Sequence, residues 1–238
     1  MTFKFLKMVL TTCSYAIFIS LGVLSVSGTA SATLIEAIAN LNEGDKYRVV
    51  FVTSTTRDAT SSDISDYNDF VSNLALSGTV TSTLGLEWTA LASTSAVNAQ
   101  VNTGISNLDS DTVNIFNTNG EIIATSGEDL WDGNLANPIR YDENRFKTNE
   151  IVRTGTTSNG ENNNNYELGE VESYTGLAFN QIFVWINFDF DQGENDYSFY
   201  GVSESVTKQI VEAPAPGTVI LLSLGLAGLS FALYRRQS

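Results

Sequence analysis

The chain contains no histidine and a single cysteine, Cys13, among its 238 residues. The absence of histidine excludes imidazole acid–base catalysis and removes a common nitrogen ligand of zinc. Cys13 lies in a segment that we expect to be removed on export, so disulfides, thiolate nucleophiles and thiolate metal sites are excluded from the mature chain. Any enzymatic chemistry would have to use carboxylates, Ser and Lys, or Tyr.

Basic residues are also scarce. The chain has 12 Lys and Arg against 27 Asp and Glu; 8 of the basic and 26 of the acidic residues lie in segment 33–211, which therefore carries a net charge of −18. A surface of this sign repels nucleic acid and anionic lipid, so we expect no nucleic-acid partner. The same charge suits solubility in an outer compartment or the attraction of divalent cations.

The first 32 residues have the pattern of a signal peptide. Lys4 and Lys7 give a positive start, residues 8–26 form an apolar stretch, and Ala30 and Ala32 flank Ser31 as a small-residue cleavage site. We therefore predict export, with a mature chain that begins at Thr33.

The last segment, 212–238, is predicted to hold a membrane helix. Residues 217–234 carry no charge, and 18 helical residues at about 1.5 Å each span roughly 27 Å, which is enough to cross a bilayer core. Arg235 and Arg236 follow this stretch and would stay on the cytoplasmic side. The alternative is a helix buried in a large core, which a domain of this size rarely encloses.

Three small residues, Pro214, Ala215 and Pro216, precede the apolar stretch, and two arginines end it. Together these features resemble the PEP-CTERM sorting tail, although Ala215 stands where that family usually has glutamate. The resemblance implies export by a Gram-negative bacterium, processing by an exosortase-type enzyme and an association with exopolysaccharide gene clusters. It also implies that the protein is anchored in the membrane through the C-terminal helix, and reaches the cell surface or the extracellular space if it is processed.

Between the two targeting segments, the first half of segment 33–211 alternates helical and strand patterns. Residues 49–52 form an unbroken β-branched and aromatic run, typical of a strand buried on both faces. Ser62 precedes an apolar stripe at helical spacing. The predicted elements are a short helix over 34–41, a central strand over 47–53, a helix from 63 to Gly78, a strand over 86–91 and a helix from 93 to Gly104.

The second half reads mainly as strands and loops. Asn119 and Gly120 predict a type I′ turn in a hairpin over 113–124. Alternating side chains predict that 181–191 is the longest strand, paired antiparallel with 197–203 across a turn near Gly193. With a short strand over 151–154, the pattern favours an α+β fold with an antiparallel sheet.

The order of these segments resembles secreted bacterial domains with a C-type-lectin-like, endostatin-like fold. The resemblance covers about residues 46–205 and is carried by core aromatics, turns and helix caps. It implies an antiparallel sheet with two helices and long loops. True C-type lectins use disulfides, and bind sugar through calcium held by a Glu-Pro-Asn-type loop and a Trp-Asn-Asp strand. The mature chain has no cysteine, and Trp185, Ile186 and Asn187 match that strand only in part. Calcium-dependent sugar binding is therefore not implied.

Oxygen-rich side chains cluster around Gly193. Asp189, Asp191 and Asp196 are candidate ligands for a hard cation such as calcium. The loop is not an EF-hand, because Tyr200 stands where that motif needs a glutamate. The alternative interpretation is a solvated hairpin whose carboxylates bind no metal.

Four large aromatic side chains allow two interpretations. Trp88, Trp131, Trp185 and Tyr197 could form a sugar-stacking face, but side chains of this kind at this spacing are more often core.

These patterns predict an exported, non-enzymatic protein of the cell envelope or extracellular matrix, with a binding or structural role associated with exopolysaccharide. No catalytic residue is assigned. The alternative is a polysaccharide-acting enzyme, which needs two carboxylates about 5–10 Å apart across a sugar, and no such pair can be chosen from the sequence. A third possibility is an inert structural component of the matrix.

Overall fold

The computed structural model describes residues 33–163 and 165–209. Within these ranges no helix is long and apolar enough to cross a membrane. The predicted targeting features lie outside the described ranges. They are the cleavage site at Ala30 and Ala32, the motif Pro214, Ala215 and Pro216, the apolar stretch 217–234, and Arg235 and Arg236.

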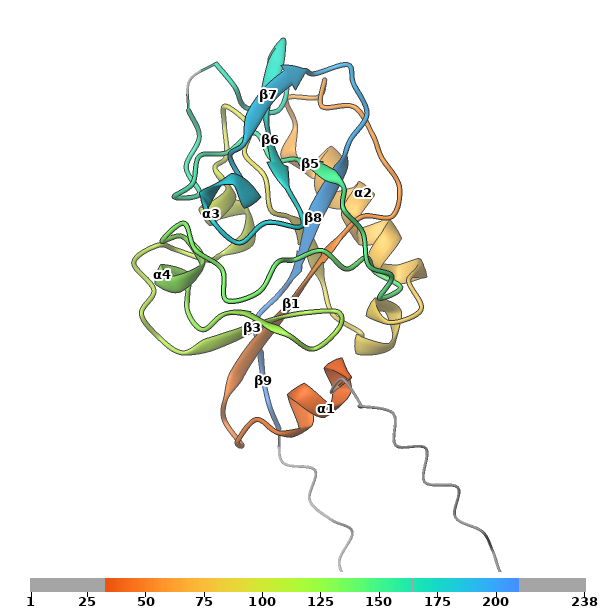
Figure 1. Ribbon diagram of the computed structural model, residues 1–238, viewed down its shortest axis with the longest axis vertical. Coiled ribbons are helices and arrows are strands. Elements are labelled where there is room, and N and C mark those ends of the chain that lie inside the picture. Colours follow the sequence, from red (N-terminus) through yellow and green to blue (C-terminus); the bar gives the residue numbers. More distant parts are fainter. Residues whose placement is uncertain (1–32, 164, 210–238) are drawn as a thin grey trace, which may run out of the picture. The chain divides into compact units, whose positions relative to one another are not determined.

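The described part of the chain is α+β, as predicted, and is built on a nine-stranded sheet (Figure 1). Its main strand order is β4-β3-β1-β8-β5-β6-β7, with β2 paired to β8 and β9 paired to β1. The helices are α1 (Leu34–Ala39), α2 (Ile64–Ser77), α3 (Ala99–Thr103) and α4 (Gly127–Leu130), with 3-10 turns η1 (Thr81–Leu84) and η2 (Phe183–Trp185). The strands are β1 (Lys46–Val52), β2 (Trp88–Ala90), β3 (Val113–Asn117), β4 (Ile122–Ala124), β5 (Ile151–Arg153), β6 (Glu172–Leu177), β7 (Asp189–Gln192), β8 (Ser198–Ser203) and β9 (Val206–Thr207).

The sheet is mixed, so the prediction of an antiparallel sheet is wrong. Strands β1 and β3 run parallel, and so do β5 and β8. A parallel pair needs a long crossover between its strands. The chain supplies one through α2, β2 and α3, and a second through β6 and β7.

Strand β1 lies at the centre, and its burial confirms the sequence prediction. Val49 and Phe51 belong to one apolar cluster, and Val50 and Val52 to another. The first cluster includes Tyr67 of α2. Helix α2 packs against β2 and β8. Because successive side chains of a strand point to opposite faces, β1 joins both halves of the core.

Helix α2 confirms the clearest helical prediction, one residue later than expected at its start. The N-cap is Asp63, whose carboxylate accepts a hydrogen bond from Ser65 N at 3.0 Å. Tyr67 and Val71 are fully buried, and Gly78 ends the helix.

The hairpin of β3 and β4 forms, but the turn differs from the expected type. Gly120 has a positive φ of 86°, whereas Asn119 does not. Asn117 organises the turn, because its side-chain oxygen accepts from the N–H groups of Asn119 and Glu121, both at 3.0 Å. The loop is therefore of the common three-residue kind, in which a type I turn is followed by a left-handed glycine, here Gly120. The helix expected from residue 93 is also shorter, because Asn98 caps α3.

The long strand predicted over 181–191 is wrong. Asn180 accepts hydrogen bonds from the N–H groups of Gln181 and Ile182, which turns the chain into η2. Trp185 then enters the core, and the absence of a side chain at Gly176 allows this turn to lie on β6, since a Cβ there would be 2.1 Å from the Trp185 carbonyl oxygen. Burial of one tryptophan overrides the alternating pattern.

As a result, β7 and β8 are not partners. Strand β7 is restricted to Asp189–Gln192 and pairs with β6. Strand β8 pairs with β1, β2 and β5 instead.

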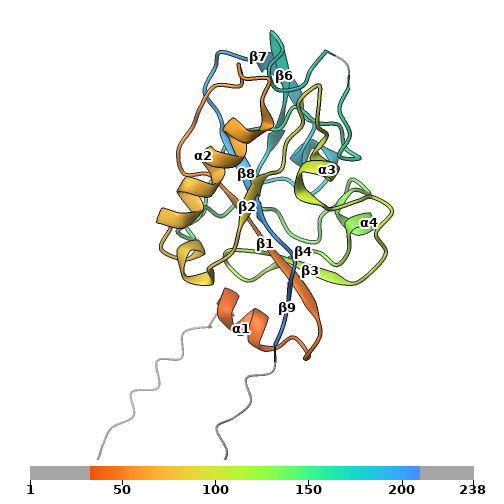
Figure 2. The ribbon, with the colours of Figure 1, turned by 180° about the vertical axis from the view of Figure 1, so that it is seen from behind.

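The two ends of the described chain lie at the same end of the domain. Strand β9 pairs with the start of β1, and the Lys208 ammonium donates to the carbonyl oxygens of Ala39 and Leu41 just after α1. Figures 1 and 2 show α1 and β9 at one end and β6 and β7 at the other. Both apolar clusters lie between Leu34 and Val202, so segment 33–209 carries its own core and is expected to fold alone.

Candidate functional site

The segment around η2 and β7 exposes an unusual number of large apolar side chains. Phe183 is 55 % exposed, Phe188 49 % and Phe190 44 %, and Phe179 and Ile182 are exposed as well. Isolated exposed apolar residues are ordinary, whereas several gathered together indicate an interaction surface.

Phe190 belongs to an aromatic group centred on Tyr166. Its ring centroid lies 4.8 Å from that of Tyr166, which lies 5.0 Å from that of Tyr174. Tyr174 stands directly opposite Phe190 on β6, and Phe188, which is exposed, comes just before β7, two residues before Phe190. We call Tyr166, Tyr174, Phe188 and Phe190 the aromatic edge.

Polar groups border the aromatic edge. The Asn163 amide donates to the Tyr174 hydroxyl at 2.9 Å, and the Gln192 amide donates to Glu172 at 3.0 Å. Flat aromatic rings flanked by amides and hydroxyls offer both stacking and hydrogen bonding to a ligand. The sequence prediction missed this site because it placed these phenylalanines in a long strand over 181–191 without indicating which face is exposed.

Strand β7 comes last in the main strand order, so one of its edges has no partner strand within 33–163 and 165–209. The N–H groups of Phe190 and Gln192 donate to the carboxylates of the residues before them, Asp189 at 2.9 Å and Asp191 at 2.8 Å. Charged side chains on an edge strand discourage pairing with a second sheet. Asp189 and Asp191, two of the predicted calcium ligands, therefore accept hydrogen bonds from backbone N–H groups of their own strand.

The three predicted calcium ligands do not converge in the structure. In the described ranges no three His, Cys, Asp or Glu side chains are grouped closely enough to hold a metal ion. Asp191 accepts hydrogen bonds from the Tyr197 hydroxyl and the Asn195 amide, and Asp196 is exposed in the following turn. Calcium binding by Asp189, Asp191 and Asp196 stays a prediction.

A buried guanidinium occupies the inner side of this loop. Arg153, on β5, is fully buried and donates to the carbonyl oxygens of Asp191 at 2.9 Å, Gln192 at 2.9 Å and Asn195 at 3.3 Å. Burial lowers the pKa of Arg153, while Tyr197 and Asp191 favour its charged form. Carbonyl oxygens of this kind are calcium ligands in other loops, but here the chain provides its own cation. No sequence signal distinguishes Arg153 from an ordinary strand residue.

The tryptophans do not form a sugar-stacking face. Trp88 and Trp131 are 4 % exposed and Trp185 is 0 % exposed. Trp131 and Trp185 stack at 6.2 Å between ring centroids, and Tyr197 is half-buried beneath Arg153. The interpretation of the tryptophans as core residues is confirmed.

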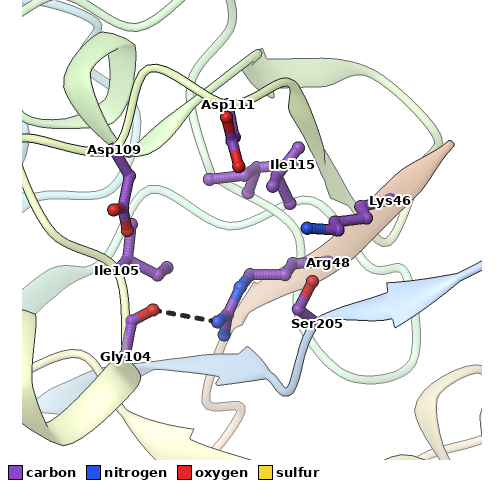
Figure 3. A pocket seen from close by; sticks show the side chains of 10 residues that line it. Lys46, Arg48, Gly104, Ile105, Asp109, Asp111, Ile115 and Ser205 are labelled. Atoms are coloured by element: carbon purple, nitrogen blue, oxygen red, sulfur yellow. Dashed lines mark hydrogen bonds between the residues drawn. The ribbon is translucent and has the colours of Figure 1, made fainter.

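A separate pocket of 210 Å³ opens beside the start of β1. Lys46 and Arg48 share one face of β1, and Asp109 and Asp111 come from the loop after α3; Figure 3 shows these four side chains around a common space. Apolar side chains also line the pocket: Ile105, Val113 and Ile115.

The pocket walls are fixed by hydrogen bonds and close packing. Arg48 donates to the carbonyl oxygens of Thr103 at 3.0 Å, Ser203 at 2.8 Å and Gly104 at 3.1 Å. Burial lowers the pKa of Arg48, and Asp109 and Glu204 oppose that shift. Gly127 lets the acidic loop approach, because a Cβ at this position would lie 2.2 Å from the Ser106 carbonyl oxygen.

Among the residues that the structure describes, we single out two candidate binding surfaces, the aromatic edge and the charged pocket. No protein-family model matches the sequence, and no curated protein matches it either. The candidate sites therefore rest on their own geometry and chemistry.

Proposed function

We propose that the protein is an exported, non-enzymatic module that binds neutral polysaccharide of the extracellular matrix through its aromatic edge. The observation that carries the proposal is the group of tilted rings formed by Tyr166, before β6, Tyr174 on β6 and Phe190 on the outermost strand β7, with the exposed Phe188 just before that strand. The apolar faces of sugar rings pack on such rings, and the neighbouring amides and carboxylates accept or donate hydrogen bonds to sugar hydroxyls.

The charge of the domain selects among polysaccharides. Segment 33–211 carries a net charge of −18, and Asp189, Asp191 and Glu172 lie on the two strands that form the aromatic edge. An anionic polymer would be repelled at long range and at contact. A neutral polymer would not be repelled.

The placement of the aromatic edge supports a tethered role. The tail predicted to enter the membrane follows Gln209, at the end of the domain that holds α1 and β9. The aromatic edge lies at the other end (Figures 1 and 2). Attachment through the tail would leave the binding surface directed away from the membrane.

The same proposal includes a C-type-lectin-like fold, an exosortase-type enzyme as processing partner and location at the cell surface after processing. The fold is supported by the α+β class, the long connections between strands and the pairing of β1 with β9 near the two ends of the described chain. The processing partner and the location are supported only by the resemblance of residues 212–238 to a sorting tail.

The test is retention of the purified domain, residues 33–209, on the neutral fraction of polysaccharide isolated from the producing cells. We expect retention with and without a calcium chelator, and no new reducing ends. We expect the double change Phe188→Ala with Phe190→Ala to reduce retention about tenfold or more, because each ring supplies stacking worth about 1 kcal/mol beyond its buried area.

The matched control is Phe146→Ala, because Phe146 is 72 % exposed but lies outside β6 and β7. This variant should be retained like the unchanged domain. Equal loss in both variants, or retention that survives the double change, would contradict the aromatic edge as the site. New reducing ends would favour the enzymatic alternative.

A further inference from the structure

We propose that the pocket beside β1 binds a small zwitterion with an apolar side chain, of the size of an aliphatic amino acid. This inference is independent of the polysaccharide proposal, because the pocket and the aromatic edge share no residue. The proposal rests on the arrangement of charge, the apolar lining and the volume of the pocket.

The charges in the pocket are separated by sign. Lys46 and Arg48 are alternate residues of β1 and so lie on one side, while Asp109 and Asp111 reach the same space from the loop after α3 (Figure 3). A ligand carboxylate beside the basic pair and a ligand ammonium beside the acidic pair would each form charge-assisted hydrogen bonds. The lining carries two positive and two negative groups, so a ligand of zero net charge complements it.

The charge of the whole domain favours the same ligand. A net charge of −18 over segment 33–211 opposes the approach of simple anions. A simple cation would meet Lys46 and Arg48 in the pocket. A ligand of zero net charge avoids both penalties, and a zwitterion also gains charge-assisted contacts with both pairs.

The remaining lining sets the size and the side chain. Ile105, Val113 and Ile115 provide an apolar wall against which an aliphatic group can pack. The volume of 210 Å³ is below the roughly 300–1,000 Å³ of pockets for drug-sized ligands, which suits a molecule of about nine heavy atoms rather than a polymer.

The pocket is held in place before any ligand arrives. Arg48 is fixed by three carbonyl oxygens, and Asp109 accepts a hydrogen bond from Ser106 N at 3.1 Å within its own loop. Trp131 donates to the Ile105 carbonyl oxygen at 2.8 Å, which ties the apolar wall to the core. Preorganised groups lose little conformational freedom on binding.

The test is titration calorimetry of the domain, residues 33–209, with L-leucine. We expect a Kd on the order of 0.1–1 mM for a ligand of this size. Two analogues each lack one charge: 4-methylpentanoate has no ammonium group, and 3-methylbutylamine has no carboxylate. Glycine lacks the side chain. Each analogue should bind about tenfold more weakly than leucine, or not measurably.

Two substitutions test the opposite sides of the pocket. Lys46→Gln and Asp111→Asn each remove one exposed charge and should each weaken leucine binding about tenfold. The matched controls are Lys147→Gln and Asp69→Asn, which remove exposed charges elsewhere and should leave the Kd unchanged. Circular dichroism checks whether each variant is folded.

Several results would overturn the proposal. One is the absence of saturable heat with leucine up to about 20 mM, far above the expected Kd. Another is equal binding of leucine and either singly charged analogue. If Lys46→Gln weakens binding and Asp111→Asn does not, the pocket is an anion site and the zwitterion is excluded. The analogue comparison decides the question even if a variant fails to fold.

Discussion

The guanidinium carbon of Arg153 lies 4.6 Å from the ring centroid of Tyr197, and the Tyr197 hydroxyl donates a hydrogen bond to Asp191. Arg153 also donates to the carbonyl oxygens of Ser173 on β6 and of Asp191 on β7. A single buried cation therefore connects β5 to the hairpin that carries the aromatic edge. We expect the order of that hairpin to depend on Arg153, although this residue touches no proposed ligand.

We expect Arg153→Lys to lower the free energy of unfolding by about 3 kcal/mol or more. A lysine ammonium has three donors and no planar fork, so several carbonyl oxygens would lose their partners while the charge stays buried. Urea unfolding measures the change. Arg145→Lys, at an exposed position, should stay within about 0.5 kcal/mol of the unchanged domain. A loss below about 1 kcal/mol for Arg153→Lys would show that the hydrogen bonds from Arg153 to the carbonyl oxygens are not needed for stability.

We expect calcium to have little effect on the stability of the domain. The carbonyl oxygens of Asp191, Gln192 and Asn195 already bind Arg153. A ligand that binds only the folded state raises the melting temperature as its concentration exceeds its Kd. Melting curves in calcium, in magnesium and in chelator should therefore agree within about 1 °C. A rise specific to calcium, abolished by Asp191→Asn, would restore Asp189, Asp191 and Asp196 as a calcium site.

Stability should depend on pH through Asp191. Hydrogen bonds from the Tyr197 hydroxyl and from Gln192 N, with smaller help from Asn195 and Arg153, lower the pKa of this carboxyl against the opposing effect of burial. Because the folded pKa lies below the unfolded value of about 4, the contribution is complete above that value. It is lost as the pH falls through the folded pKa.

The measurement is the difference in melting temperature between the unchanged domain and Tyr197→Phe from pH 7 to pH 2.5. We expect a difference that is constant above pH 5 and shrinks below about pH 4. A difference that does not change with pH would mean that the Tyr197 hydroxyl acts independently of the Asp191 charge.

Loss of the edge carboxylates should cause self-association. Asp189→Thr would remove the acceptor of Phe190 N and one charge from the outer edge of β7, beside the exposed Phe188 and Phe190. A threonine keeps the strand propensity and leaves the edge open to a second sheet. Light scattering should detect dimers or larger species at concentrations where the unchanged domain is monomeric. Asp69→Thr, on α2, is the control.

The parts of the fold that depend on local pattern were predictable. The unbroken apolar run of β1 and the stripe of α2 each determine one element, and both were predicted within one or two residues. The region after β6 was not predictable, because burial of Trp185 against Trp131 overrides a local preference for a strand. Pairing directions such as β5 with β8 arise from contacts distant in sequence.

In the candidate sites, too, the features set by local sequence were predictable and those set by distant contacts were not. The exposure of Phe188 and Phe190 was not predicted, because alternation alone does not reveal which face of a strand is covered. Lys46 and Arg48 are visible as neighbours on a strand, but nothing local brings Asp109 and Asp111 to them. The role of Asp189 and Asp191 at the edge depends on the position of β7 at the end of the sheet.

The position of β8 has a mechanical consequence. Between Phe190 and Gln209 the chain passes along β8, which is hydrogen-bonded to β1 on one side and to β2 and β5 on the other. Tension between a polymer held at the aromatic edge and an anchor beyond Gln209 would follow this short covalent route. The load would pull β8 along its neighbours, a shear geometry in which many hydrogen bonds share the force. The rest of the domain would lie outside the line of tension.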